Sequence, residues 1–363
     1  MNFPTQYSKI INRIESINPN EYAKTRNHLN GMVTFLSPYL TRGVITLSQV
    51  RDVVLQKYSE KESEKLIQEL AWREYFQKVY QEKGDEIFSD LRFPQTKINN
   101  IFLSDSIVKA ATGITILDTA ISDLYETGYM HNHARMWVAS MATNIAGSAW
   151  LKPSRWMYYH LLDGDLASNS LSWQWVCGAF SSKQYVAHQE LINACSPSDQ
   201  SQTGTFLDIP RDQLLGMDIP EVLEKNSELE LPVFLPESDD IKVLNKNLVI
   251  YHPWCLDPNY RNIEVADKVV IIEPSHFQKY PISEKVMNFI IKIAKDNISD
   301  ITIFVGEFSD LVKNYDGEVF YQYHKNVEHF SGHKDIQVEL FPDVKGYYKN
   351  FFSFWKSCQK SIR

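Results

Sequence analysis

The residues best suited to chemistry lie between Gly128 and Phe180, where amide, carboxylate, guanidinium and indole side chains are concentrated. Seven of them are candidates for contact with a buried cofactor: Asn132, Arg135, Trp150, Asp163, Asp165, Asn169 and Trp173. Polar groups of these kinds can hydrogen-bond the edge of a bound ring system, and indoles can pack against it. A core made only for packing does not need so many polar and indole side chains in one block. Their density therefore predicts a cofactor site.

The segment LIQELAWREYF carries a second group with functional potential. On a helix, Glu69, Trp72 and Arg73 are spaced i, i+3 and i+4, so a carboxylate, an indole and a guanidinium share one face. Such a face could bind a ligand. Taken alone, the segment is better explained as an amphipathic helix with one buried tryptophan and a surface ion pair.

Two turns combine polar side chains with the start of a helix. Asp163 and Asp165 flank a glycine immediately before a helix, where they could serve only as capping residues worth about 1 kcal/mol. Ser37 and Pro38 are typical of a helix N-terminus, whose free amides suit a diphosphate. A serine N-cap followed by proline explains this second pair without any ligand.

Apolar periodicity predicts which elements position these side chains. Helices are expected near residues 46–58, 62–83, 105–127, 129–148 and 153–162. The last third contains the strand-like runs NLVIYHP, DKVVIIEP, DITIFVGE and EVFYQYH, with an amphipathic helix, SEKVMNFIIKIAKDN, between the second and third. We therefore predict a multi-domain protein, with a mainly α-helical domain followed by a smaller α/β, Rossmann-like domain with a mostly parallel sheet.

The net charge of -8 is unevenly distributed. Residues 212–240 hold 1 Lys/Arg against 9 Asp/Glu, whereas residues 1–211 hold 20 against 21 and residues 241–363 hold 16 against 15. The acidic segment also has three prolines, which is typical of a solvated linker. We predict a helical catalytic domain at 1–211, an acidic linker at 212–240 and an α/β domain at 241–363. The near-neutral charge of the first domain is compatible with a local basic surface on it, which composition alone does not prove.

Several classes of protein are disfavoured by the sequence. No run of 18 apolar residues occurs, and the N-terminal MNFPTQYSKI lacks the pattern of a secretory signal, so no membrane association is expected. Cys177, Cys195, Cys255 and Cys358 have neither CxxC nor CxxH spacing. Reduced thiols in a cytoplasmic protein, and no metal site, are therefore expected.

In combination these motifs resemble the FAD-binding half of the DNA photolyase and cryptochrome family, whose members carry a DGDLAxN loop before a WQW helix, an ELxWREF segment and a TSxLSPYL-type turn. The chain has LLDGDLASNSLSWQWV, LIQELAWREYF and VTFLSPYL, and the likeness extends from about residue 20 to 210. The resemblance implies that FAD is bound by Tyr22, Thr34, Leu36, Ser37, Arg73, Arg135, Asp163, Asp165 and Asn169. Phe35 stands where many members have a basic residue.

The resemblance also implies a site for damaged DNA. The implied lesion contacts are Arg26, Glu69, Trp72, Asn132, Met136 and Trp175. Family members that repair the (6-4) photoproduct have histidines at the positions of Asn132 and Met136, whereas those that repair cyclobutane dimers have the asparagine and methionine found here. The implied partner is DNA containing cyclobutane pyrimidine dimers, and the implied catalytic residues are Glu69, Asn132, Trp150 and Trp173.

Two of these residues are implied members of an electron-supply chain. Trp173 matches the first donor to light-excited flavin, and Trp150 matches the middle tryptophan. The outer tryptophan is missing, because its expected place near Lys97 has no aromatic residue except Phe93. Trp137, Trp156 and Tyr158 are candidates to replace it, and each is explained equally well as packing.

The order of the domains differs from that of the family, in which the α/β antenna domain comes first. A circular permutation or a replaced antenna domain would explain the difference. The carboxyl ends of the strands, around His252 to Asp257 and Glu307, are the default place for a small ligand. A second, antenna chromophore of unknown identity is one interpretation, and a structural domain without a ligand is another. Only Cys177 and Cys195 lie in the helical domain, so the four thiolates of the family's iron–sulfur branch are not present there.

We therefore predict a light-driven carbon–carbon lyase, a deoxyribodipyrimidine photolyase that acts as a monomer. In this interpretation, excited reduced FAD donates an electron to a flipped-out dimer, the ring splits and the electron returns; photolyases are a known example of base flipping. A cryptochrome-like photosensor that binds FAD without repair is the alternative, and a light-independent flavoprotein is a third candidate. The complete set of lesion-pocket residues favours repair.

Overall fold

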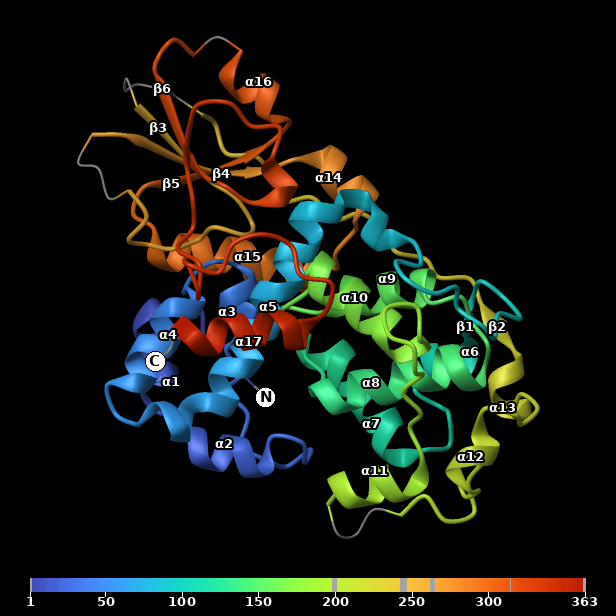
Figure 1. The fold of residues 1–363 in the computed structure, drawn as a ribbon. Coiled ribbons are helices and arrows are strands. Elements are labelled where there is room, and N and C mark those ends of the chain that lie inside the picture. The colour runs from blue at the N-terminus through green and yellow to red at the C-terminus, as the bar shows by residue number, and fades with distance from the viewer. Residues whose placement is uncertain (1, 198–200, 242–246, 262–264, 314, 362–363) are drawn as a thin grey trace. The chain divides into compact units, whose positions relative to one another are not determined.

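The computed structural model describes residues 2–197, 201–241, 247–261, 265–313 and 315–361 (Figure 1). Contacts between residues divide the chain into two compact units. Unit 1 contains Met1–Pro19, Thr34–Glu74 and Leu231–Arg363, and unit 2 contains Asn20–Val33 and Tyr75–Glu230.

Unit 2 is built almost entirely of helices (Figure 1). They are α2 (Pro19–Thr25), the last part of α5 (Glu60–Lys83), η1 (Gly84–Phe88), α6 (Asp105–Val108), α7 (Thr115–Thr127), α8 (Asn132–Ser140), η2 (Met141–Ile145), α9 (Leu151–His160), α10 (Leu166–Cys177), α11 (Gln189–Cys195), α12 (Arg211–Leu214) and α13 (Glu221–Glu224). A short antiparallel pair joins β1 (Leu103–Ser104) to β2 (Asn226–Ser227). Three fully buried indoles, Trp137, Trp156 and Trp173, lie in the core.

Two predicted helices of unit 2 are interrupted. The segment predicted as one helix at 105–127 forms α6 and α7, separated by a turn in which the Asp118 carboxylate accepts the N–H groups of Thr112 and Gly113. Gly113 has φ +80°, which ends regular helix geometry. The segment 129–148 likewise divides into α8 and the π-helical turn η2. In the first segment, side-chain hydrogen bonds to backbone amides compete with the helix, and apolar periodicity does not report them.

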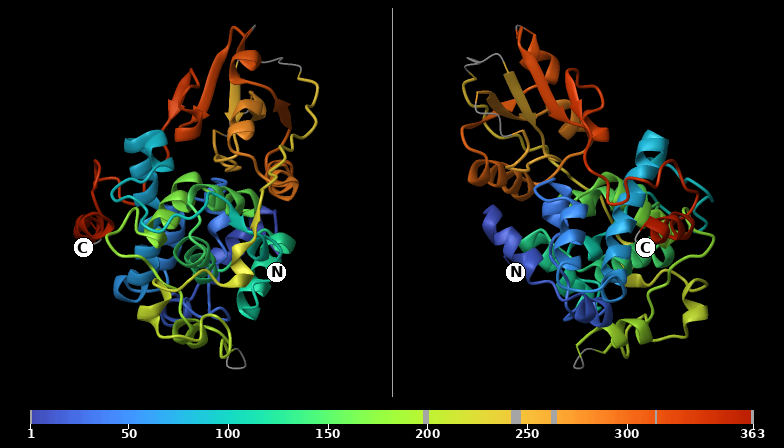
Figure 2. Two further views of the ribbon diagram at one scale, coloured as in Figure 1. Left: turned by 90° about the vertical axis from the view of Figure 1, so that its right-hand side faces the viewer. Right: turned by 60° about the vertical axis from the view of Figure 1, so that its left-hand side comes forward.

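Unit 1 combines helices with a parallel sheet (Figure 2). Its helices are α1 (Tyr7–Glu15), α3 (Ser37–Thr41), α4 (Leu47–Leu55), the first part of α5, α14 (Pro274–Lys279), α15 (Glu284–Asn297), α16 (Phe308–Val312), η3 (Lys325–Val327) and α17 (Phe351–Ser361). Its strands are β3 (Asn247–Tyr251), β4 (Asp267–Ile272), β5 (Ile301–Val305), β6 (Glu318–Gln322) and β7 (His333–Asp335). Among the described residues they form one sheet in the order β5-β4-β3-β6-β7, with every pair parallel.

The predicted fold class is confirmed, with a helical part and an α/β part that has a parallel sheet. All four strand-like runs form strands, and the amphipathic segment between the second and third forms α15. The strand runs are almost continuously apolar because helices such as α14, α15 and α16 lie around the sheet (Figure 1). The three-residue, polar β7 was not predicted, because its sequence HKD carries no strand pattern and its pairing depends on β6.

The segment predicted as an acidic linker is partly folded. It contains most of α12 and all of α13 and β2, and the side chains of Leu214 and Leu223 are buried. Residues 228–241 have neither helix nor strand. The two compact units do not coincide with the predicted domains, because residues 34–74 group with the α/β part. The domain boundaries at 211 and 240 therefore stay a prediction.

Three observations concern thiols, metals and membranes. Cys177, Cys195, Cys255 and Cys358 are buried and free. The described part of the chain contains no group of three or more His, Cys, Asp and Glu side chains that could hold a metal ion. None of the helices within the described ranges is long and apolar enough to span a bilayer.

Candidate functional site

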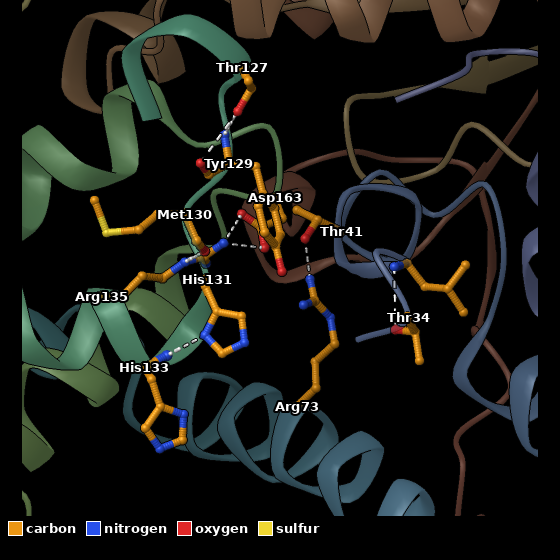
Figure 3. A network of polar contacts seen from close by, with 11 residues as sticks. Thr34, Thr41, Arg73, Thr127, Tyr129, Met130, His131, His133, Arg135 and Asp163 are labelled. Atoms are coloured by element: carbon orange, nitrogen blue, oxygen red, sulfur yellow. Dashed lines mark hydrogen bonds and ion pairs between the residues drawn. The ribbon is translucent and has the colours of Figure 1, made fainter. Parts of the chain in front are cut away.

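An ion pair joins Arg135 on α8 to Asp163 in the turn between α9 and α10 (Figure 3). Arg135 Nη2 donates to both carboxylate oxygens, at 3.0 and 2.9 Å, and Nε donates to the Met130 carbonyl oxygen at 2.8 Å. The Asp163 side chain is 4% exposed and that of Arg135 is 21% exposed. Because both charges are largely withdrawn from water, each depends on the other for compensation.

Two glycines shape the turn that carries Asp163. Gly128 ends α7 with φ +74°, in the region that favours glycine, and its carbonyl oxygen accepts the N–H of Leu162. A Cβ on Gly128 would lie 2.6 Å from Leu162 Cγ, and one on Gly164 would lie 2.9 Å from the Tyr158 carbonyl oxygen. A side chain at either glycine would displace the turn, and the ion pair with it.

Asp165 caps the N-terminus of α10, as one interpretation of the sequence expected. Its Oδ1 accepts the N–H of Ser168 at 2.7 Å, and its Oδ2 accepts Nε2 of Gln77 at 2.7 Å. Asn169 donates through Nδ2 to the Ser154 carbonyl oxygen at 2.9 Å. The capping contacts leave one polar atom at this turn unexplained. Ser168 Oγ is buried and has no hydrogen-bond partner among the described residues. A polar ligand at the first turn of α10 would satisfy it.

Burial controls ionisation beside this ion pair. Burial, opposed by the Arg135 guanidinium, raises the pKa of Tyr129 to about 12. Burial, together with electrostatic repulsion from His133 and Arg135, lowers the pKa of His131 to about 4, so its ring is neutral at pH 7. The Nδ1 atom of His131 accepts the N–H of His133 at 3.2 Å, which makes His131 the N-cap of α8.

Asn132 and Met136 lie one turn apart on α8 and contact each other, with 3.8 Å between Nδ2 and Sδ. Asn132 is exposed and Met136 is half-buried. Arg135 comes from the same helix. Helix α8 therefore carries residues that the sequence assigned to the lesion next to one that it assigned to the flavin.

The tryptophans assigned to electron supply are buried in unit 2. Trp150 and Trp173 are 3% and 2% exposed, and both belong to the main core cluster. Trp150 donates through Nε1 to Asp90 Oδ1 at 2.7 Å. Trp175, assigned to the lesion pocket, is half-buried, and its ring centre lies 5.6 Å from that of Tyr185. Burial is compatible with electron transfer and with packing alike.

The candidates for the missing outer donor are buried as well: Trp137 is 0%, Trp156 2% and Tyr158 2% exposed. Because these rings are buried, none of them can contact a soluble reductant directly. Trp156 does donate through Nε1 to the hydroxyl of Tyr125 at 3.1 Å, and Tyr125 is half-buried. A path through Trp156 would therefore have to continue through Tyr125.

From Thr34 onward, the residues of VTFLSPYL lie at the start of α3 in unit 1. The helix begins at Ser37 with Pro38 in its first turn, as predicted. Its N-cap is Leu36, and no side chain caps it, so the explanation of Ser37 as an N-cap is wrong. Thr34 Oγ1 accepts the N–H of Leu36 at 3.4 Å. Phe35 has φ +51°, a conformation that non-glycine residues rarely adopt.

Arg73 of α5 is bound to α3, since its Nη2 donates to Oγ1 of Thr41 (Figure 3). Both residues belong to unit 1, and Arg73 is half-buried. This contact orients the guanidinium relative to Leu36, Ser37 and the rest of α3. Three of the predicted flavin residues are thus held on one short helix and its neighbour.

Glu69 and Trp72 share α5 with Arg73, as the spacing predicted, but each has its own partner. Glu69 Oε1 lies 3.0 Å from Lys65 Nζ, and its side chain is 29% exposed. Trp72 stacks on Phe351 of α17, with 3.6 Å between ring centres and an interplanar angle of 10°. One ring face of Trp72 is therefore covered by an aromatic residue from the C-terminal helix.

Tyr22 and Arg26 lie on and just after α2 in unit 2, and both are half-buried. The Arg26 amide donates to the Tyr22 carbonyl oxygen at 3.0 Å, and Arg26 Nη1 donates to Asn27 Oδ1 at 2.6 Å. Tyr22 was assigned to the flavin and Arg26 to the DNA.

The predicted site residues are divided between the units. Unit 1 holds Thr34, Leu36, Ser37, Glu69, Trp72 and Arg73, and unit 2 holds Tyr22, Arg26, Asn132, Arg135, Met136, Trp150, Asp163, Asp165, Asn169, Trp173 and Trp175. Sequence reasoning missed Gln77, Asp90 and Phe351. The first two contact predicted residues 88 and 60 positions away, and no local pattern signals such contacts.

The polar groups of unit 2 fit a flavin. A flavin has hydrogen-bond donors and acceptors along one edge of an otherwise apolar ring system. Arg135 and Asn169 offer donors, Asp163 and Asp165 offer acceptors, and the buried Ser168 Oγ is unsatisfied among the described residues. The chemistry of this donor set therefore agrees with the cofactor that the resemblance implies.

At the carboxyl ends of the parallel strands, the polar side chains form local hydrogen bonds. Burial lowers the pKa of His252, which follows β3, to about 3, and its Nε2 lies 2.9 Å from a backbone carbonyl oxygen of β6. Asp257 Oδ1 accepts the N–H of Asn259 at 2.9 Å. Glu307 accepts the N–H and the hydroxyl of Ser275, at 2.9 and 2.7 Å. A small-ligand site at this end of the sheet stays a prediction.

Part of the chain is similar to proteins of a known family. A family model described as the FAD binding domain of DNA photolyase matches residues 66–206. A deoxyribodipyrimidine photo-lyase of Streptomyces griseus is 32% identical over 164 residues, which cover 44% of this chain and 35% of that protein. One of a Synechococcus species is 38% identical over 113 residues, or 30% of this chain and 23% of that protein. A cryptochrome DASH of Danio rerio is 30% identical over 168 residues, or 43% of this chain and 32% of that protein. The chain thus matches no more than 35% of the length of each of these relatives.

Proposed function

We propose that the chain, whose residues 66–206 match the FAD-binding domain of DNA photolyase, is a member of the photolyase/cryptochrome family and acts as a deoxyribodipyrimidine photolyase, which splits cyclobutane pyrimidine dimers in DNA under light. Both photolyases and a cryptochrome DASH are among its relatives, so the family by itself does not select repair. The observation that carries the proposal is the pair Asn132 and Met136, in contact on α8 beside the Arg135–Asp163 ion pair. A protein that only senses light has no need of an amide and a thioether placed for a lesion.

We assign contacts with FAD to residues of each unit, taken separately. In unit 2, Arg135, Asp163, Asp165 and Asn169 offer charged and amide groups, and Tyr22 lies on α2. In unit 1, Thr34, Leu36, Ser37 and Arg73 lie at or beside α3. Bound and fully reduced FAD supplies the electron for dimer cleavage after it absorbs light. The ion pair keeps the Arg135 guanidinium oriented, and the Asp165 cap holds the first turn of α10, so these groups of unit 2 are positioned before a ligand binds.

We assign the dimer to six side chains. Glu69 hydrogen-bonds the dimer and stabilises its radical anion, Asn132 and Met136 line the pocket, Trp72 and Trp175 clamp the bases, and Arg26 contacts the DNA. Stacking of an indole on a base contributes about 1–3 kcal/mol, which offsets part of the few kcal/mol needed to unstack the lesion. Trp173 and Trp150 would pass electrons from an external reductant to an oxidised flavin, if it is bound.

Repair by the reduced protein tests the proposal directly. Chemically reduced protein that carries FAD is mixed with an oligothymidine containing cyclobutane dimers and illuminated with blue light, and the recovery of thymine absorbance is followed. We expect recovery in the light and none in a dark sample or without protein. Protein that retains FAD but leaves the dimers intact would exclude repair and support a photosensor.

Replacing Glu69 by alanine is expected to slow ring splitting about 10- to 150-fold while FAD stays bound, because a hydrogen bond to a charged group is worth about 1.5–3 kcal/mol. The rate is measured per absorbed photon with dimer DNA at saturation. Lys65→Ala is the matched control, since it removes the 3.0 Å ion pair but leaves the carboxylate in place. Equal rates in Glu69→Ala and the unchanged protein would remove Glu69 from the reaction.

One observation favours the alternative of a cryptochrome-like photosensor. Phe351 covers one ring face of Trp72 at 3.6 Å, and the repair proposal needs a face of that indole for the lesion. A sensor would bind FAD, undergo photoreduction and leave dimers unchanged. A second, antenna chromophore in the α/β part and a cytoplasmic location stay predictions under either function.

A further inference from the structure

Helix α17 (Phe351–Ser361) has two faces of opposite character. Phe351, Phe354, Trp355 and Cys358, spaced i, i+3, i+4 and i+7, are buried within unit 1. The amides of Leu340 and Phe341, in the segment that leads to the helix, donate to the Glu74 carboxylate of α5. The inner face of α17 is therefore fully used, and the helix is held against α5.

The outer face combines one exposed aromatic ring with lysines. Phe352 is 70% exposed, the highest value among the large hydrophobic side chains of the described residues. Lys356 and Lys360 follow at i+4 and i+8 on the same side, and Lys349 precedes the helix, and all three are exposed. None of these three lysines forms an ion pair with any residue that the structure describes.

The charge of this segment opposes that of the whole chain. Residues 344–361 contain four lysines and no aspartate or glutamate, whereas the chain carries a net charge of -8. A cluster of exposed lysines around an exposed ring is the composition that binds single-stranded nucleic acid, in which the cations follow the phosphates and the ring stacks on a base.

The outer face is adjacent to a residue assigned to the lesion. The Phe352 ring centre lies 6.4 Å from that of Trp72 in an edge-to-face arrangement, and the neighbouring Phe351 stacks on the same indole. A DNA strand that follows the lysines of α17 would therefore lie next to Trp72. No residue of this helix falls within the match to the family, which ends at residue 206.

We propose that the outer face of α17, formed by Lys349, Phe352, Lys356 and Lys360, binds the DNA strand that flanks the dimer, with Phe352 stacked on an unpaired base. The inference rests on the proposed function, because it supplies a surface for that function's substrate. An anionic membrane also attracts lysines, but membrane binding needs a continuous apolar face, and on α17 that face is already buried in unit 1.

The test measures binding of a fluorescent oligothymidine, with and without one dimer, by anisotropy over a range of salt concentrations. Phe352→Ala is expected to weaken binding about 5- to 150-fold, the range found when a base-stacking aromatic ring is removed. Lys356→Gln combined with Lys360→Gln is expected to reduce the slope of log K against log salt by about 1.4, because each phosphate contact contributes about 0.7 on a single strand. All these side chains are exposed, so thermal unfolding should be unchanged.

Two control variants match these changes elsewhere on the surface. Phe93→Ala removes another exposed ring, 45% exposed, and Lys9→Gln with Lys295→Gln removes two other exposed lysines. Both controls should bind as the unchanged protein does. Anionic vesicles of phosphatidylserine and phosphatidylcholine are the competing surface, and we expect no binding to them that depends on Phe352.

The outcomes separate this inference from the proposed function. Affinity lost in Phe352→Ala but kept in Phe93→Ala supports the surface. If the unchanged protein repairs dimers while Phe352→Ala and the double lysine variant bind DNA normally, the surface is wrong and the function stands. If repair is absent but both variants lose affinity for DNA, the function is wrong and the surface stands. Phe352-dependent binding to vesicles, with no effect on DNA, would overturn the inference in favour of a membrane.

Discussion

Replacing Asp163 by asparagine is expected to reduce the free energy of unfolding by about 3 kcal/mol and to release FAD, which is the largest effect on stability that we predict. Both carboxylate oxygens accept from Arg135 Nη2, and the Asp163 side chain is only 4% exposed. Removing one partner of a buried pair leaves the other charge without compensation, at a cost of about 3–5 kcal/mol. The 21% exposure of Arg135 places the expected value at the lower end of that range.

The measurements are the urea midpoint and the flavin absorbance that remains after gel filtration. Asp335→Asn is the control, because it breaks the contact of Asp335 with Arg261, in which both side chains are 33% exposed. This half-buried pair is screened by solvent more than the Arg135–Asp163 pair, so the control should keep its FAD and lose less stability than Asp163→Asn does. An Asp163→Asn protein with the original midpoint and a full complement of FAD would show that the ion pair supports neither.

Replacing Trp173 by phenylalanine is expected to abolish photoreduction of the oxidised flavin while chemically reduced protein repairs dimers at the original rate. Trp173 is 2% exposed in the core of unit 2, and phenylalanine keeps an apolar ring there but is much harder to oxidise than an indole. The two readouts separate electron supply from repair. A variant that lost both would have lost its fold or its FAD, which the flavin absorbance detects.

Trp254→Phe provides the matched control for this prediction. Trp254 is 7% exposed and lies in the core of the α/β part, so its replacement changes a buried indole without touching the proposed electron path. Photoreduction should be normal in this control and lost again in Trp150→Phe. Normal photoreduction in Trp173→Phe would assign Trp173 to packing alone.

Local patterns predicted the elements of the fold well where the pattern is strong. The apolar runs that became β3 to β6 and the amphipathic segment that became α15 were all identified from sequence. The short β7 was not, and the predicted helix at 105–127 is broken by hydrogen bonds of the Asp118 side chain. In both cases the decisive interaction is a specific hydrogen bond, which average apolar periodicity does not represent.

In the candidate site too, local spacing was predicted from the sequence and distant contacts were not. Sequence spacing predicted that Glu69, Trp72 and Arg73 share a helix, and α5 confirms this. It did not predict that Trp72 stacks on Phe351, which lies near the other end of the chain. The packing of α17 decides how much of the Trp72 ring a ligand can reach, and that packing depends on apolar residues that carry no chemical motif.

By itself the sequence determined the residue types of the candidate site, their spacing along helices, the Asp165 cap of α10 and the order of helical and α/β parts. These features depend on interactions between residues close along the chain, and such interactions leave local patterns. Only the tertiary structure decided that Arg135 binds Asp163, 28 residues away, and that Gln77 binds Asp165, 88 residues away. Burial makes every charge and amide require a partner, and the folded packing decides which distant residue provides it.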